Sequence, residues 1–262
     1  MIFEPMLIFV ALFQVFPFLI EGITGFGGSV VGAPFNAAWM GVENSVPFNT
    51  LLAMPILIYT AAKCYKQCNY KELIKILLIL APGFLLGNYF GTIVDAASAS
   101  VLIGGAVTLI ALINCYKHIF VPFVLKKPVD EDKPDTMGQK VFRYFCLICG
   151  SLVHGAFTIG GPLVTVYTIN AVKDKYAFRS TMITMWVFLD AFNSIRMGVT
   201  GRYTPYVLTA VALAVPVTFF AYWLGFKILH KVNREQFLRI VYIVLLGVGL
   251  NMFIRNIVLV LA

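Results

Sequence analysis

The stretch Glu21-Gly22-Ile23-Thr24-Gly25-Phe26-Gly27-Gly28 lies inside one long apolar run, and a similar stretch, His154-Gly155-Ala156-Phe157-Thr158-Ile159-Gly160-Gly161, lies inside another. A shift of 133 positions superposes the two terminal glycine pairs and also pairs Tyr70 with Tyr203. A chain that repeats at half its length, with a glycine-rich break opening each copy, is typical of transporters built from two related halves. We therefore expect two membrane-embedded copies of one helical unit.

The composition indicates that the surrounding solvent is lipid. The chain is 60% hydrophobic and 12% charged, with a mean hydropathy of +0.87, whereas soluble domains are about a quarter charged. A membrane-spanning helix needs about 20 apolar residues, and the apolar runs fill almost the whole chain. We predict an all-α polytopic membrane protein whose helical runs are Leu7–Met40, Val46–Ala62, Leu73–Val94, Ser100–Ile119, Val141–Val172, Thr181–Ile195, Tyr206–Leu229 and Phe237–Leu261.

Two of these runs are too long for one span and too short for two. Leu7–Met40 has 34 residues and Val141–Val172 has 32. A half-helix, a glycine break and a second half-helix fit this length, with Pro17 and the Gly22–Gly28 stretch interrupting the first run and Gly155–Pro162 the second. Each copy should therefore open with a re-entrant or paired helical segment.

Basic residues between the runs predict the orientation. If each long run re-enters or crosses twice, the loops at Lys63–Lys75, Lys117–Arg143, Lys173–Arg179 and Lys227–Arg239 share one side and hold 17 of the 20 Lys and Arg residues. The positive-inside rule favours this arrangement, which makes the halves inverted-topology repeats with both termini outside. The expected organisation is a first repeat at 1–125, a cytoplasmic linker at 126–140 and a second repeat at 141–262. The net charge of +8 thus indicates orientation and predicts no nucleic-acid partner.

The motifs resemble the sulfite exporter TauE/SafE family of membrane transporters. The resemblance is carried by Gly22-Ile23-Thr24-Gly25-Phe26-Gly27-Gly28 with the following Gly32-Ala33-Pro34, by its echo at Gly155–Pro162, by the chain length and by Thr200-Gly201-Arg202-Tyr203. It implies a secondary carrier for sulfite, sulfoacetate, another organosulfonate or a related sulfur compound. The second copy has His154 and Thr158 where the first has Glu21 and Gly25, so the copies differ chemically.

The breaks themselves indicate an anion site. A half-helix that starts inside the membrane presents unpaired N–H groups and the positive end of its dipole, and glycine lets an oxyanion approach the main chain. In an inverted repeat the two breaks would converge into one shared site. Close helix packing through small residues is the alternative. The expected binding residues are Thr24, Gly25, Gly27, Gly28, Ser29, Thr158, Gly160 and Gly161.

Ionisable residues inside apolar runs are candidates for coupling transport to protons. Glu21 and His154 occupy equivalent positions beside the two breaks, and either is suited to carry the coupling proton. The alternatives are that Glu21 caps a half-helix through its carboxylate and that His154 is a packed core residue.

Asp190, Asn193 and Arg196 recur at three-residue spacing on one predicted helix. Arg196 offers paired donors to a sulfonate, with Asn193 hydrogen-bonding alongside and Asp190 as a buried partner or second proton site. The alternative is that Arg196 extends to the membrane interface and ends the helix.

Other functions lack support in the sequence. The histidines His118, His154 and His230 are widely separated, and Cys146 and Cys149 form no recognisable metal motif, so we expect no enzyme, metal or cofactor. An anion channel without coupling remains the alternative to a carrier. The sequence therefore predicts a proton-coupled anion transporter in the cytoplasmic membrane, in contact with the lipid bilayer, and it leaves homo-oligomerisation open.

Overall fold

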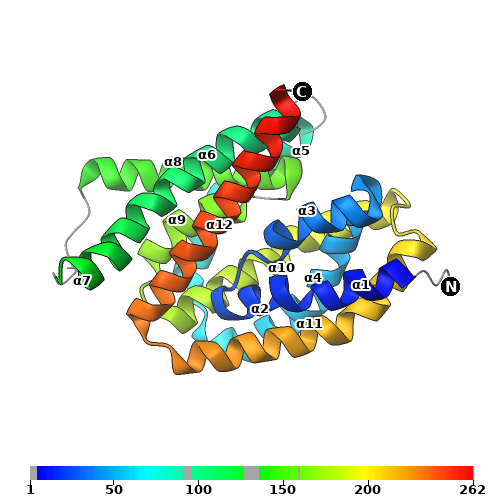
Figure 1. The fold of residues 1–262 in the computed structure, drawn as a ribbon, viewed down its shortest axis with the longest axis horizontal. Coiled ribbons are helices and arrows are strands. Elements are labelled where there is room, and N and C mark those ends of the chain that lie inside the picture. The colour runs from blue at the N-terminus through cyan, green and yellow to red at the C-terminus, as the bar shows by residue number, and fades with distance from the viewer. Residues whose placement is uncertain (1–4, 91–95, 127–135, 159, 262) are drawn as a thin grey trace. The chain divides into compact units, whose positions relative to one another are not determined.

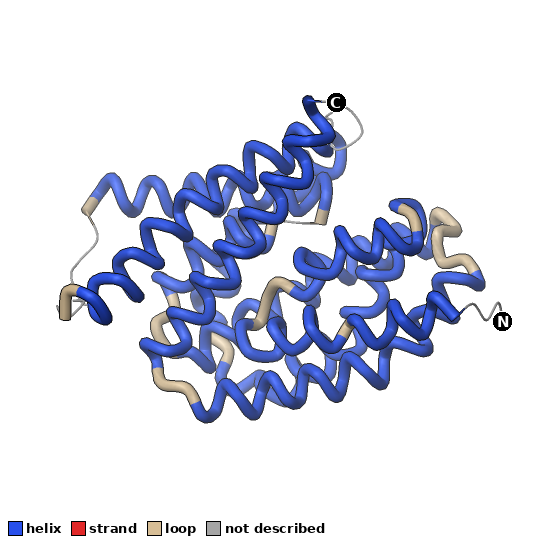
Figure 2. The backbone as a smooth tube through the Cα atoms, viewed as in Figure 1, coloured by secondary structure: helices blue, strands red, loops and turns tan. Residues whose placement is uncertain are grey.

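Helices are the only regular elements in the part of the chain that the structure describes. The computed structural model describes residues 5–90, 96–126, 136–158 and 160–261, and Figure 1 and Figure 2 show these segments as helices joined by short loops. The predicted all-α class is confirmed. Within the described residues, six helical segments are long and apolar enough to cross a membrane: Pro5–Thr24, Glu43–Gln67, Tyr70–Tyr89, Val101–Val124, Pro205–Lys231 and Arg234–Val258.

Both long apolar runs are broken at their glycines, as predicted. In the first, α2 (Val15–Thr24) is followed by α3 (Gly28–Met40); in the second, α8 (Met137–Phe157) is followed by α9 (Gly161–Ala171). At 1.5 Å per residue, α3 and α9 are only about 20 and 16 Å long, short of the roughly 30 Å hydrocarbon thickness. Each run therefore contains a half-helix that is too short to cross on its own.

Pro17 interrupts the first run a second time. The helix α1 (Pro5–Phe13) ends before Gln14, and α2 begins one residue later. Because Pro17 has no N–H, the carbonyl of Phe13 loses its helical donor four residues later, which is the usual cause of a kink one turn before a proline. The predicted contribution of Pro17 is thus confirmed, with the interruption displaced by about one turn towards the N-terminus.

Three long helices follow each broken run. The first set is α4, α5 and α6, and the second is α10, α11 and α12, so the order of elements repeats along the described chain. The inverted orientation of the two halves stays a prediction. The bounds are Val42–Cys64 for α4, Tyr70–Phe90 for α5, Ala96–Cys115 for α6, Val121–Val124 for the short α7, Lys175–Val199 for α10, Pro205–Lys231 for α11 and Arg234–Leu261 for α12.

The helices gather into two compact units, each made of two stretches that are separated in the sequence. The first unit comprises residues 1–73 and 174–231, and the second comprises 74–173 and 232–262. The predicted repeats at 1–125 and 141–262 would each contribute to both units, and they stay a prediction. Most of the predicted linker, residues 127–135, lies outside the described residues.

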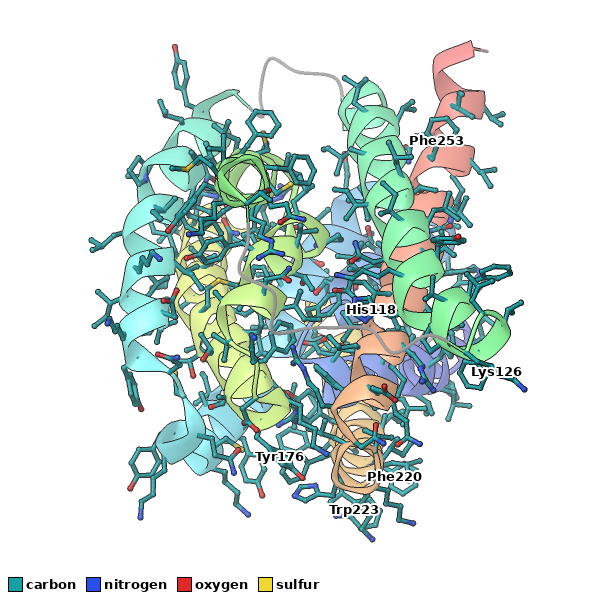
Figure 3. All side chains as sticks on the ribbon, turned by 90° about the vertical axis from the view of Figure 1, so that its left-hand side faces the viewer. His118, Lys126, Tyr176, Phe220, Trp223 and Phe253 are labelled. Carbon is teal, nitrogen blue, oxygen red and sulfur yellow. The ribbon has the colours of Figure 1, made fainter. Side chains whose placement is uncertain are left out.

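Small residues bring the helices close together within each unit. In the first unit α11 packs along α1 and α2 (Figure 1), and a Cβ at Gly22 would lie only 2.6 Å from the carbonyl oxygen of Tyr222. In the second unit α6 packs along α12, where Gly105 meets Phe253, labelled in Figure 3. Close backbone approach through glycine is the normal packing mode of membrane helices.

Large apolar side chains cover the outside of the first unit. Phe220 and Trp223 project outward from α11 in Figure 3, and they are 57% and 51% exposed. An exposed apolar surface of this kind is expected where a helix faces lipid instead of water.

Candidate functional site

The break between α2 and α3 is built from two left-handed glycines and a threonine. Gly25 (φ +79°) ends α2, and its N–H donates to the carbonyl of Glu21 at 2.7 Å; Gly27 (φ +97°) caps α3. The buried Thr24 hydroxyl lies 2.7 Å from the carbonyl oxygen of Phe26 and 2.8 Å from a carbonyl in the preceding turn. These bonds satisfy backbone groups that the break would leave unpaired. Thr24 thus forms part of the frame of the break.

The carboxyl group of Glu21 occupies the N-terminus of α3. Its side chain is 4% exposed, and its carboxyl group lies directly against Gly28, the first residue of α3. A Cβ at Gly28 would overlap the Oε2 atom of Glu21, so only glycine leaves room for this carboxyl. Oε2 itself has no hydrogen-bond partner in the described chain. The positive end of the α3 dipole therefore faces a buried acidic group.

Arg179 is the buried cation of this site, and the sequence analysis missed it. Its Nε donates to the carbonyl oxygen of Gly22 at 2.8 Å, near the C-terminus of α2, where helix carbonyls lack partners. Its guanidinium carbon lies 5.0 Å from the ring centroid of Tyr222 and 4.6 Å from that of Phe226. The side chain is 2% exposed, and its Nη2 has no hydrogen-bond partner among the residues described.

The sequence predicts a basic loop at Lys173–Arg179, and this prediction is wrong for Arg179. The carboxylate of Asp174 accepts hydrogen bonds from the N–H groups of Tyr176 and Ala177, at 3.0 and 2.8 Å, and starts α10. Arg179 therefore lies in the second turn of a helix. An N-cap aspartate five residues before the arginine was the signal available in the sequence.

Gly25 is fixed by the same arginine. A Cβ at Gly25 would lie 3.0 Å from Cγ and 3.1 Å from Cα of Arg179, and its positive φ already disfavours other residues. The α2–α3 break therefore rests directly on the second turn of α10. Both charges are placed at complementary helix ends, with Glu21 at the N-terminus of α3 and Arg179 at the C-terminus of α2.

Further along α10, two predicted residues share the face that carries Arg179. Asp190 is half-buried, lies three turns away, or about 16 Å along the helix axis, and interacts electrostatically with Glu21, as Arg179 does. Asn193 is completely buried, and neither its Nδ2 nor its Oδ1 finds a hydrogen-bond partner in the described part of the chain. Arg196, in the last turn, is exposed. The buried face thus combines Arg179, Asp190 and Asn193, whereas Arg196 lies away from it.

Ser29 directly follows Gly28, the residue against which the Glu21 carboxyl lies. It is the second residue of α3 and is half-buried, and the described residues include no hydrogen-bond partner for its hydroxyl. Gly27 and Gly28 precede it and are buried. The start of α3 therefore presents a hydroxyl as well as backbone N–H groups.

The second break, in the other unit, has a similar backbone. Thr158 (φ +59°) ends α8, and its N–H donates to the carbonyl of His154 at 2.9 Å; Gly160 caps α9, which starts at Gly161 with Pro162 in its first turn. His154 is 4% exposed, with its ring centroid 5.9 Å from that of Phe84. A Cβ at Gly160 would lie 2.7 Å from the His154 Cβ. Close packing thus surrounds this histidine.

Several membrane-spanning helices that enclose buried polar groups at a helix break are typical of a membrane transporter. The sequence model of the sulfite exporter TauE/SafE family matches residues 8–252, so the chain belongs to this family. Its members are transporters, not enzymes, and membership implies an anion exporter of the sulfite and sulfonate class. No curated protein and no solved structure matches the chain.

Proposed function

We propose that this protein is a secondary active exporter of a small sulfur-containing anion, most directly sulfite or an organosulfonate, across the cell membrane. We further propose that export is coupled to the proton gradient. Family membership supports the anion class. The position of buried charged and polar groups at the α2–α3 break supports the coupling.

One observation carries the proposal: several buried polar atoms on one face of α10 and at the break have no hydrogen-bond partners. In the described residues these atoms include Glu21 Oε2, Arg179 Nη2 and both amide atoms of Asn193. Each unpaired buried polar group costs about 1–3 kcal/mol, and more when it is charged. Groups with this cost are retained where a ligand completes their hydrogen bonds.

The ligand that these groups suit is an oxyanion. Arg179 offers a fixed N–H donor, and the start of α3 offers backbone N–H groups, the Ser29 hydroxyl and the positive dipole end. We include Asn193, about 21 Å along α10 from Arg179, as a proposed amide donor further along the same helix face. In the other unit we include Thr158, Gly160 and Gly161 in the proposed binding residues because Thr158 ends α8 in the left-handed conformation, as Gly25 ends α2, and the two glycines open the half-helix α9.

Proton coupling needs a titratable group near the anion. Glu21 is the main candidate because its carboxyl lies at the start of α3, and Asp190 interacts with it electrostatically. His154 holds the equivalent position in the second break. A carboxyl that gains a proton changes the charge of the site by one unit, which makes anion affinity depend on pH.

The experiment is current measurement from purified protein in liposomes on a solid-supported membrane. Sulfite, sulfate, thiosulfate, taurine, sulfoacetate and acetate are applied with and without a pH gradient. A saturable response to a sulfur anion that the gradient alters supports the coupled exporter. A non-saturating conductance that admits chloride would instead establish an uncoupled channel, and a saturable response indifferent to pH would remove proton coupling.

A further inference from the structure

The buried acidic group at the start of α3 occupies the position that suits the substrate. We infer that the ionised Glu21 carboxylate itself occupies the anion site. A sulfonate binds Arg179 and the α3 N-terminus only when Glu21 is protonated and no longer occupies that site. The inference rests on the proposed function and specifies how proton and anion are linked.

The Glu21 carboxyl lies where an anion would bind at a helix N-terminus. Its Oε2 lies directly against Gly28, where a Cβ atom would overlap it. A carboxylate and a sulfonate both present oxygen acceptors with one negative charge, so both suit the N-terminus of a half-helix. One set of N–H donors cannot serve two anions at once, and the two groups must therefore compete.

Arg179 uses only part of its hydrogen-bonding capacity within the described chain. Its Nε is committed to Gly22, and its guanidinium is held over two aromatic rings, yet Nη2 has no hydrogen-bond partner among the described residues. Arg179 and Glu21 interact electrostatically, but the described residues include no ion pair between them within 4.0 Å. The cation is thus fixed in place with a donor left for another anion.

The net charge of the buried site favours binding a proton together with the anion. When Glu21 binds one proton it loses one negative charge, and a monovalent sulfonate brings one back, so the net charge of this buried site is unchanged. The alternative, an ionised Glu21 together with a sulfonate, places two anions beside one cation in a low-dielectric site. Charge balance therefore links one proton to each anion bound.

The surroundings of Glu21 fix which groups can modify this linkage. Arg179 and Asp190 interact with its carboxyl from α10, and the Tyr222 hydroxyl interacts with it from α11. Gly28 lies directly against it at the start of α3. Asp190 is the only other carboxylate among these described groups, and it is therefore the group that must be tested against Glu21.

The test is calorimetric binding of isethionate, a sulfonate that stays ionised at both acidic and alkaline pH, to the full-length protein in detergent. In the wild type the affinity should fall about tenfold for each pH unit once Glu21 is ionised, because each bound anion takes up one proton. A pH-indicator dye should register uptake of about one proton per anion. Glu21→Gln should bind isethionate with the affinity that the wild type shows in acid, at every pH and without proton uptake.

Matched variants separate the outcomes. Glu43→Gln alters an exposed carboxylate in the first turn of α4 and should keep the wild-type pH profile. Arg179→Gln should weaken binding at least tenfold at every pH. If Asp190→Asn, and not Glu21→Gln, removes the pH dependence, Asp190 takes the proton and the inference is wrong.

Binding measurements on the wild-type protein alone decide between the remaining outcomes. Isethionate binding that is indifferent to pH and takes up no proton would overturn the inference while leaving an anion carrier in place. If the wild type binds none of isethionate, sulfite and sulfoacetate at any pH, the proposed function itself fails. These wild-type measurements do not depend on whether Glu21→Gln folds.

Discussion

Gly25 and Thr158, which the 133-residue shift pairs, perform the same backbone task in the two breaks. Each ends the helix before its break, α2 or α8, in the left-handed conformation, at φ +79° and +59°, and each donates its N–H to the carbonyl four residues earlier, in Glu21 and His154 respectively. Glycine adopts this conformation freely, whereas a β-branched threonine is a conformational outlier there. The repeat therefore preserves a backbone turn while changing its side chain.

Exchanging these residues should change stability in opposite directions. Thr158→Gly should raise the free energy of unfolding by about 1 kcal/mol because it relieves left-handed strain. Gly25→Thr should lower it by more than this amount, since the new Cβ would also press on Arg179. Thermal unfolding in detergent, followed by tryptophan fluorescence, measures both. A lower melting temperature for Thr158→Gly would show that side-chain contacts of Thr158 outweigh its strain.

A methyl group at Gly22 should separate α2 from α11. Its Cβ would lie 2.6 Å from the Tyr222 carbonyl oxygen, so Gly22→Ala should cost about 1–3 kcal/mol of stability. Gly247→Ala on α12 is the control, because a Cβ there meets nothing within 4 Å and alanine favours the helix by up to about 1 kcal/mol. Equal melting temperatures for the two variants would contradict the close approach.

We expect Asn193 to contribute to transport and not to the stability of the fold. Replacing its buried amide by leucine removes two unpaired polar atoms, so Asn193→Leu should unfold at a higher temperature while losing most anion transport. Asn36→Leu is the matched control, because both ends of this buried amide are hydrogen-bonded. Its Oδ1 accepts a hydrogen bond from the Gln14 Nε2 at 2.9 Å, and its Nδ2 donates to the Asn49 Oδ1 at 2.6 Å. Asn36→Leu should be destabilised by about 1–3 kcal/mol. Destabilisation of Asn193→Leu would assign Asn193 a structural role.

The two candidate arginines can be told apart by transport assays. Arg179→Lys removes the planar guanidinium, in which Nε donates to the Gly22 carbonyl while Nη2 is left to bind an anion. The substitution should therefore reduce transport at least tenfold. Arg202→Lys, at an exposed site, is the control and should retain transport. A larger loss in Arg196→Lys than in Arg179→Lys would favour the arginine chosen from the sequence.

Cys68, outside the membrane-spanning segments, should react slowly with maleimide. Burial raises the pKa of its thiol above the ordinary value of 9.0, although a hydrogen bond with Thr181 acts in the opposite direction. Because only the thiolate reacts, the native protein should show little labelling at neutral pH and faster labelling as the pH rises above the ordinary thiol pKa. A variant that retains Cys68 as its sole cysteine gives the rate, and the same variant unfolded in detergent is the control. Equal native and unfolded rates would contradict its burial.

Local signals in the sequence predicted the membrane class and the two breaks. Apolar runs longer than one span require an interruption, and clustered glycines supply the left-handed residues at Gly25 and Gly27 that end one helix and start the next. The Glu21 carboxyl was correctly placed beside a half-helix. These features depend on residues within a few positions of one another, so they can be inferred without knowing the fold.

Arg179 illustrates what only the tertiary structure decided. In the sequence it stands beside Lys173 and Lys175 and looks like another loop charge, whereas Arg196 looks like the buried cation. In the fold Arg179 is buried against Gly22 and two rings of α11, and Arg196 is exposed. The sequence by itself determined an all-helical membrane protein with two glycine breaks. Which charge enters its interior was decided by tertiary packing, because burial depends on the helices, distant in sequence, that cover each face of α10.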